Sequence, residues 1–160
     1  MRKAKVPVVP GTKEPVYTVE QALEAVKEIG FPVMIKASAG GGGKGMRVAG
    51  NEQEFAKLFE TAQQESVHSF SDNTMYLERF VENPRHVEVQ ILADKYGNVV
   101  HLGERDCSVQ RRHQKMIEES PCIAISDDLR KKMGETAVRA AKAAGYESAG
   151  TIEFLLDQSG

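Results

Sequence analysis

Residues 31–49 read FPVMIKASAGGGGKGMRVA, and this stretch decides which fold the chain adopts. Its two ends, Val33–Lys36 and Met46–Ala49, are short apolar runs of the length typical of β-strands. Between them, residues 40–45 include five glycines, whose backbone lacks Cβ atoms and lets the amides approach phosphate oxygens closely. The stretch therefore predicts two strands joined by a phosphate-binding loop.

The glycine run differs from two familiar nucleotide loops. A Walker loop carries Ser or Thr after its lysine, whereas Gly45 follows Lys44 here. A dinucleotide fingerprint joins a strand to a helix, whereas this run joins two predicted strands. A flexible linker is the alternative interpretation, but Lys36 at the end of the first strand and Lys44 inside the run favour an anion site.

Sequence periodicity predicts helices on both sides of this stretch. Apolar residues recur at helical spacing after Thr18, Asn51 and Ser126, whose side chains suit a helix N-cap. The polar residues 66–73 are expected to form a loop. The predicted strands are 75–80, 86–91, 99–104 and 150–156, with a further extended, polar segment at 106–115. Helices mixed with hairpin-connected strands predict an α+β fold with mixed or antiparallel sheets.

The composition limits the class of protein. The chain has 160 residues, of which 41% are hydrophobic and 28% charged, as in one ordinary globular domain. A formal net charge of −2 lacks the basic excess of a nucleic-acid-binding protein, so no nucleic-acid partner is expected. No apolar run approaches the roughly 18–20 residues of a membrane span, and Cys107 and Cys122 form no CxxC pair. We expect a cytoplasmic protein that does not bind a membrane.

Three further segments carry side chains suited to a nucleotide. Glu78–Val81 end a predicted strand, where backbone groups can meet an adenine edge and a carboxylate a ribose, although an ordinary surface strand is the alternative. Residues 105–115 contain four Arg or Lys, one His and two Gln, a concentration of donors that favours anions. A solvated edge strand is the alternative, and an RNA-binding patch is disfavoured because no aromatic residues are interleaved. Glu153, flanked by Ile152 and Phe154, lies either on a solvent-exposed face or against a hard cation.

Taken together, these segments resemble the carbamoyl-phosphate synthase and biotin carboxylase branch of the ATP-grasp superfamily. Residues 31–45 look like its glycine-rich signature. Residues 82–90 (ENPRHVEVQ) and 104–115 (ERDCSVQRRHQK) are similar to segments of biotin-dependent carboxylases. The likeness extends from Val6 to Glu153, and it implies an ATP-grasp fold in which helices pack on the sheets.

The resemblance also implies a division of the chain. Residues 1–81 correspond to the lid subdomain, with the glycine-rich loop at 40–45. Residues 82–160 correspond to the first part of the C-terminal catalytic subdomain. Since such enzymes continue with a second metal carboxylate and a catalytic arginine, we expect the chain to be a fragment of a longer enzyme.

Roles for individual residues follow from the resemblance alone. Lys115 corresponds to a catalytic lysine that contacts bicarbonate, and Glu153 to the first of two carboxylates that hold divalent metal ions. The residues that correspond to ATP-binding positions are Lys36, Gly42, Gly43, Glu78, Arg79, Phe80, Val81, His86, Gln110 and His113.

The implied reaction uses ATP, with Mg²⁺ or Mn²⁺, to phosphorylate bicarbonate, and then transfers the carboxyl group to biotin on a carrier protein or domain. The implied partners are that carrier, a carboxyltransferase and a second copy of the enzyme. A eukaryotic parent would be mitochondrial. An inactive nucleotide-binding fragment, or a ligase of the urea carboxylase or carbamoyl-phosphate synthase type, is the alternative.

We predict that this chain alone shows no bicarbonate-stimulated ATP hydrolysis, because the second metal carboxylate and the catalytic arginine of such enzymes are not encoded in residues 1–160. Phosphate release, measured with and without bicarbonate and biotin, checks this expectation. A clear bicarbonate-stimulated rate would contradict the interpretation of the chain as a fragment.

Overall fold

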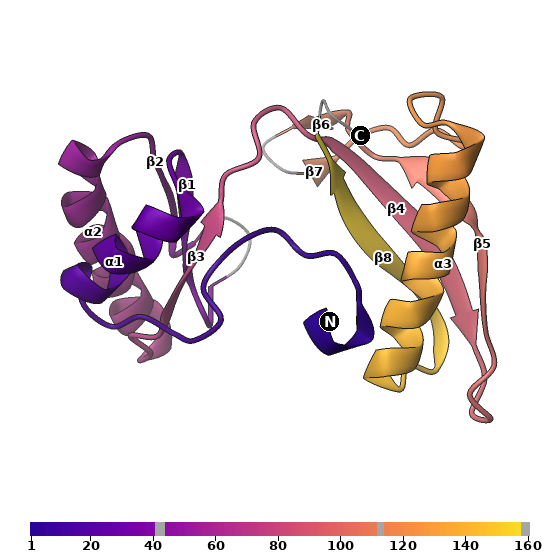
Figure 1. The fold of residues 1–160 in the computed structure, drawn as a ribbon, viewed down its shortest axis with the longest axis horizontal. Coiled ribbons are helices and arrows are strands. Elements are labelled where there is room, and N and C mark those ends of the chain that lie inside the picture. Colours follow the sequence, from indigo (N-terminus) through magenta and orange to yellow (C-terminus); the bar gives the residue numbers. More distant parts are fainter. Residues whose placement is uncertain (41–43, 112–113, 158–160) are drawn as a thin grey trace. The chain divides into compact units, whose positions relative to one another are not determined.

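The computed structural model describes residues 1–40, 44–111 and 114–157. The chain forms two compact units, which are coloured by sequence in Figure 1. The N-terminal unit is Val9–Phe80, and the C-terminal unit combines Met1–Val8 with Val81–Gly160. The assignment of residues 1–81 to a lid and 82–160 to a catalytic subdomain stays a prediction. None of the described helices is both long and apolar enough to cross a bilayer.

The N-terminal unit is an antiparallel sheet with two helices packed on one face (Figure 1). Its elements are α1 (Val19–Ile29), β1 (Val33–Ala37), β2 (Met46–Ala49), α2 (Glu52–Phe70) and β3 (Met75–Arg79), with strand order β2-β1-β3. Alternate residues of the central strand are buried, and Ile35 packs with Phe55, Phe59 and Leu77 in the core. The other face of β1 carries Lys36.

The predicted helix starts are confirmed. The side chains of Thr18 and Asn51 accept hydrogen bonds from backbone N–H groups three residues later, as N-caps do. The predicted loop at 66–73 is wrong in part, because α2 continues to Phe70. Ser66 is buried and continues the apolar stripe of Phe55, Phe59 and Ala62 along α2. Because serine is polar, the sequence did not show that the buried face of the helix extends to this position.

The C-terminal unit is a second antiparallel sheet, with strand order β5-β4-β8 and one helix packed on it (Figure 1). Its elements are a short 3₁₀ helix η1 (Arg2–Ala4), β4 (Arg85–Ala93), β5 (Val99–Asp106), β6 (Gln110–Arg111), β7 (Gln114–Lys115), α3 (Asp127–Ala144) and β8 (Ser148–Leu156). The predicted alternation in β4 is confirmed, since Val87, Val89 and Ile91 are buried in the core that α3 covers. His86, Glu88 and Gln90 therefore lie on the other face.

The predicted extended segment 106–115 is only partly correct. Two strands of two residues each, β6 and β7, form a small hairpin, and residues 107–109 are irregular. The buried carboxylate of Asp106 explains the break, because it accepts hydrogen bonds from the backbone N–H and hydroxyl of Ser108 and so turns the chain.

A buried ion pair joins α3 to the sheet. Glu104 accepts a hydrogen bond of 2.8 Å from Nε of Arg130 and one of 3.1 Å from the backbone N–H of Cys122. The side chain of Glu104 is 3% exposed and that of Arg130 is 30% exposed. The pair thus fixes the segment before α3 as well as the helix itself.

We predict that Glu104→Ala destabilises the C-terminal unit by about 1–3 kcal/mol, because it leaves Nε–H of Arg130 and the buried backbone N–H of Cys122 without their acceptor. Amide hydrogen exchange should become faster in β4 and α3 while β1 and α2 keep their protection. Glu135→Ala, which removes an exposed carboxylate from α3, is the matched control and should change exchange little. Equal effects of the two substitutions would contradict the role of the pair.

Candidate functional site

The predicted site residues fall into two groups, one in each unit. Gly42, Gly43 and His113 lie outside the described residues. The N-terminal unit contains Lys36, Glu78, Arg79 and Phe80, and the C-terminal unit contains Val81, His86, Gln110, Lys115 and Glu153.

In the N-terminal unit, Lys36 of β1 and Glu78 of β3 form an ion pair. Nζ of Lys36 lies 3.1 Å from Oε1 and 3.0 Å from Oε2 of Glu78. Both side chains are more than a third exposed, at 37% and 38%. The ammonium is therefore held by a carboxylate that can turn to solvent, so that phosphate oxygens could replace the carboxylate.

Arg79 has a structural partner. Its guanidinium donates two hydrogen bonds, of 3.3 and 3.1 Å, to the carbonyl of Ile29, the last residue of α1. A cation at this end of a helix complements the helix dipole. The backbone N–H groups of Arg79 and Phe80 donate to the carbonyls of Pro10 and Pro32. A role of this segment in binding adenine stays a prediction.

The C-terminal unit contains a small cavity of about 140 Å³, lined by both polar and apolar side chains. Four of the predicted site residues line it together with side chains that the sequence did not single out. The lining residues are His86, Val87, Glu88, Cys107, Gln110, Lys115, Glu153 and Phe154. The structure thus brings together the residues that were predicted to meet bicarbonate, the metal and the phosphate end of ATP.

Strand register explains why these side chains meet. Glu88 of β4 lies opposite Arg105 of β5 on one side and opposite Glu153 of β8 on the other. Residues directly opposite each other in a sheet point to the same face. The hairpin of β6 and β7 places Gln110 opposite Lys115. The three-stranded sheet and the β6–β7 hairpin therefore both bring polar groups to the cavity.

Glu88 is the most constrained charge of the cavity. Its buried carboxylate accepts hydrogen bonds of 2.7 Å from Nε of Arg105 and 3.2 Å from Nζ of Lys115. Burial raises the pKa of Glu88, but the hydrogen bonds from Arg105 and Lys115 outweigh burial, so that the pKa lies below its ordinary value of 4.5. Glu88 is therefore ionised at neutral pH.

Lys115 has a second carboxylate partner. Its Nζ lies 2.6 Å from Oε2 of Glu118, which is three residues later in the chain. The hydrogen bonds to Glu118 and to Glu88 raise the pKa of Lys115 above its ordinary value of 10.5. A permanently charged ammonium therefore faces the cavity.

The segment that carries Gln110 is fixed to the sheet through His86. The backbone N–H of His86 donates to the hydroxyl of Ser108 at 3.0 Å, and the N–H of Cys107 donates to the carbonyl of His86 at 2.7 Å. The side-chain amide of Gln110 donates to the carbonyl of Cys107 at 3.0 Å. These bonds position Gln110 at the edge of the cavity without help from a ligand.

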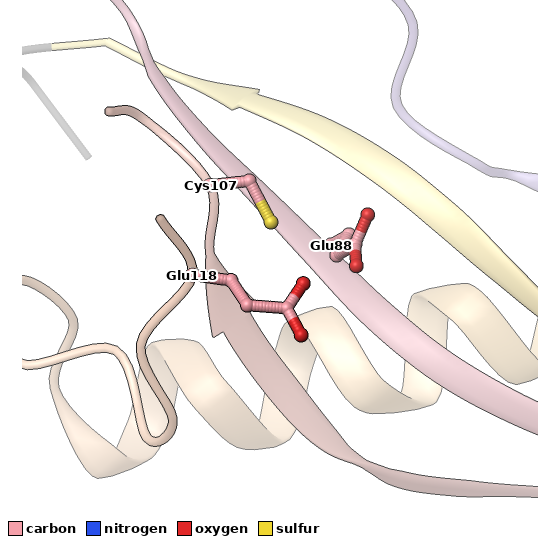
Figure 2. A group of neighbouring side chains, drawn as sticks. All are labelled: Glu88, Cys107 and Glu118. Atoms are coloured by element: carbon pink, nitrogen blue, oxygen red, sulfur yellow. The ribbon is translucent and has the colours of Figure 1, made fainter. Parts of the chain in front are cut away.

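Figure 2 shows Glu88, Cys107 and Glu118 gathered in one place. Their potential ligand atoms all lie within 4.8 Å of one another, as in a three-ligand metal site. The two carboxylates already bind the cations of Lys115 and Arg105, and burial raises the pKa of the Cys107 thiol, which favours its protonated form. The described arrangement is therefore an ion-pair cluster, which suits a metal ion poorly.

The sequence interpretation missed the roles of Glu88, Arg105 and Glu118. Glu88 and Arg105 lie in segments whose residue types were noted, but their pairing depends on the register between strands. Glu118 gave a weaker signal, since a carboxylate three residues after a lysine is common on protein surfaces.

The whole chain, residues 1–160, matches the family described as carbamoyl-phosphate synthase L chain, ATP binding domain. It is 59% identical to biotin carboxylase from Nostoc sp. over 160 residues, which are 100% of this chain and 36% of that protein. It is 56% identical to the chloroplastic biotin carboxylase of Arabidopsis thaliana, over 100% of this chain and 30% of that protein. The chain thus spans about a third of the length of these relatives.

Solved structures agree with this likeness. The biotin carboxylase–β-γ-ATP complex from Campylobacter jejuni superimposes with a TM-score of 0.93 at 53% identity, over 99% of this chain and 35% of that chain. The biotin carboxylase domain dimer of Hydrogenobacter thermophilus 2-oxoglutarate carboxylase, in complex with MgADP, ADP and bicarbonate, gives a TM-score of 0.91 at 50% identity, over 99% and 35%.

We predict that acid destabilises the C-terminal unit. Glu88 and Glu104 have pKa values below their ordinary value of 4.5 because hydrogen bonds from cationic side chains outweigh burial. The stability that these pairs contribute is present above about pH 4.5 and is lost as the pH falls through the lower folded-state values. Urea unfolding between pH 7 and about pH 3, followed by hydrogen exchange in β4, should show this loss.

Glu88→Gln should reduce this pH dependence, because glutamine does not titrate. Glu60→Gln, which changes an exposed carboxylate of α2, should leave the dependence unchanged. A Glu88→Gln protein with the full pH dependence would contradict the assignment.

Proposed function

Because the chain belongs to the carbamoyl-phosphate synthase L chain, ATP-binding domain family, we propose that it forms the ATP-binding part of a biotin carboxylase. This enzyme uses MgATP to activate bicarbonate and then carboxylates biotin. The cavity in the C-terminal unit carries the proposal, because it combines a fixed ammonium, an amide donor and an exposed carboxylate in one small space.

ATP binding is supported by the N-terminal unit. Lys36, whose ammonium is held by Glu78, serves as the phosphate-binding cation. The glycine-rich sequence 40–45 is assigned to the phosphates because its residue types suit them. The backbone around Glu78 and Val81 is assigned to the adenine and ribose, and His86 is assigned to ATP as well. The Campylobacter jejuni relative, whose structure is a complex with β-γ-ATP, supports this assignment.

Bicarbonate is assigned to Lys115. A charged ammonium, with Gln110 opposite it in the hairpin, is a donor set suited to a small planar anion. Holding the anion in a fixed place beside the γ-phosphate provides the proximity and charge stabilisation on which phosphoryl transfer depends. The complex of the Hydrogenobacter thermophilus domain with MgADP and bicarbonate supports this substrate.

Glu153 is assigned to the metal. Its exposed carboxylate lies on the cavity face of β8, and oxygen ligands of this kind suit Mg²⁺ or Mn²⁺. A bound divalent ion would neutralise charge on the phosphates during transfer. Glu153 lies opposite Glu88 in the sheet. Because Arg105 pairs with Glu88, the carboxylate of Glu153 stays available to a metal ion.

The remaining partners are part of the same proposal. A biotin carboxyl carrier protein or domain delivers biotin, a carboxyltransferase uses the carboxylated product, and two copies of the enzyme form a dimer, as the Hydrogenobacter thermophilus domain does. The enzyme acts in the cytoplasm, or in an organelle if its source is eukaryotic, since relatives include chloroplastic and mitochondrial proteins.

A hybrid enzyme tests the proposal. In it, residues 1–160 replace the matching segment of the Nostoc biotin carboxylase, to which they are 59% identical. We expect ATP hydrolysis by the hybrid to be stimulated by bicarbonate. A correctly folded hybrid that binds ATP but shows no bicarbonate stimulation would rule out the proposed function.

In the hybrid, we predict that Lys115→Ala weakens the use of bicarbonate far more than that of ATP, and that Lys36→Ala does the reverse. A charge-assisted hydrogen bond is worth about 1.5–3 kcal/mol, so each loss should be roughly 10- to 150-fold. Kinetics with each substrate varied in turn measure the two effects. Lys131→Ala, an exposed lysine of α3, is the control, and equal effects on both substrates would contradict the division of roles.

A further inference from the structure

The ammonium of Lys115 lies between two carboxylates. Oε1 of Glu88 is 3.2 Å from Nζ, and Oε2 of Glu118 is 2.6 Å from it. Arg105, which also contacts both carboxylates, completes the group. Two cations and two anions thus balance, so that an approaching anion meets no net positive charge from these four side chains.

The two carboxylates differ in how firmly they are held. The side chain of Glu88 is 10% exposed, lies on the central strand β4 and accepts a hydrogen bond of 2.7 Å from Arg105. The side chain of Glu118 is 49% exposed, and its separation from Nε of Arg105 is 3.7 Å. Moving Glu88 would break the 2.7 Å hydrogen bond from Arg105 and leave that guanidinium with Gln90 at 3.1 Å and Glu118 at 3.7 Å, whereas Glu118 can turn into water at small cost.

Glu118 also has the chemistry of the proposed substrate. A carboxylate and bicarbonate are both planar monoanions that present two oxygen acceptors to an ammonium. Of the three N–H donors of the Lys115 ammonium, one is directed to Glu88 and one, at 2.6 Å, to Glu118, so that an anion that binds at the position of Glu118 must displace it. The two cannot both hold that position.

We propose that Glu118 is a displaceable stand-in for the anionic substrate, while Glu88 is the positioning residue that keeps Lys115 in place when Glu118 leaves. The inference rests on the proposed function in that the anion is bicarbonate. Competition from Glu118 lowers the affinity for the anion and holds the ammonium extended toward the cavity until the anion arrives.

Two substitutions in the hybrid enzyme separate this role from a simple charge effect. Glu118→Gln and Glu88→Gln each remove one negative charge next to the same ammonium. A charge effect alone would lower the bicarbonate KM in both variants. The proposal instead requires opposite behaviour, since only Glu118 competes with the substrate.

We expect Glu118→Gln to lower the bicarbonate KM about 1.5- to 5-fold, the range that an exposed ion pair contributes to an equilibrium. The KM for ATP should not change. Glu88→Gln should leave the bicarbonate KM unchanged or raise it, and should lower kcat, because the ammonium is no longer fixed. Glu135→Gln on α3 is the control for a distant, exposed charge.

An equal fall of the bicarbonate KM in both variants would overturn the proposal, as would an unchanged KM in Glu118→Gln. Failure of the proposed function gives a different result, because the unsubstituted hybrid would then show no response to bicarbonate at all.

A direct measurement on the 160-residue chain does not depend on catalysis. NMR of the Lys115 side chain, in protein titrated with sodium bicarbonate and with sodium chloride as the control salt, reports when the ammonium changes its partner. Glu118→Gln should shift the bicarbonate midpoint about 1.5- to 5-fold lower. The same midpoint in Glu118→Gln and the parent chain would overturn the inference.

Discussion

The cavity depends on one buried carboxylate, that of Glu88. A charge in the middle of a sheet is stable only if cations and hydrogen-bond donors compensate for its lost hydration. Arg105 supplies one cation from the neighbouring strand β5, and Lys115 supplies a second cation from the hairpin of β6 and β7. No strand ladder joins this hairpin to the sheet among the described residues, so the ion pair acts together with the hydrogen bonds between His86 and residues 107–108 to fix Lys115 relative to β4.

Strand β5, which carries Arg105, also carries a second buried carboxylate, Glu104, on its opposite face. Glu104 and Arg105 are neighbours in β5, so their side chains point to opposite faces of the sheet. Glu104 binds Arg130 of α3 in the core, whereas Arg105 binds Glu88 in the cavity. The helix α3 and the ion pairs of the cavity are thereby attached to adjacent residues of β5. This attachment explains how the polar groups of the cavity are held in a defined geometry.

Local patterns predicted most of the fold, and interactions between distant segments account for what they missed. The caps at Thr18 and Asn51 and the alternation around Glu88 depend on neighbouring residues, and the motif resemblance identified the ATP-grasp fold that the biotin carboxylase structures confirm. The end of α2 was missed because its buried position is a serine. Glu88 was missed as a partner of Lys115 because it comes from another strand, whose placement no local pattern contains, and Glu118 because a carboxylate three residues after a lysine is common on protein surfaces.

Both lysines that were assigned to substrate anions are already paired with carboxylates, Lys36 with Glu78 and Lys115 with Glu88 and Glu118. An unpaired ammonium on a long, flexible side chain has many rotamers, and fixing it in one of them on binding costs conformational entropy. A carboxylate that holds the ammonium extended reduces this cost but competes with the substrate. The competition stays weak where the carboxylate is exposed, and here the strongly held carboxylate, Glu88, is shared with Arg105. The site can therefore be ordered in advance and still accept an anion.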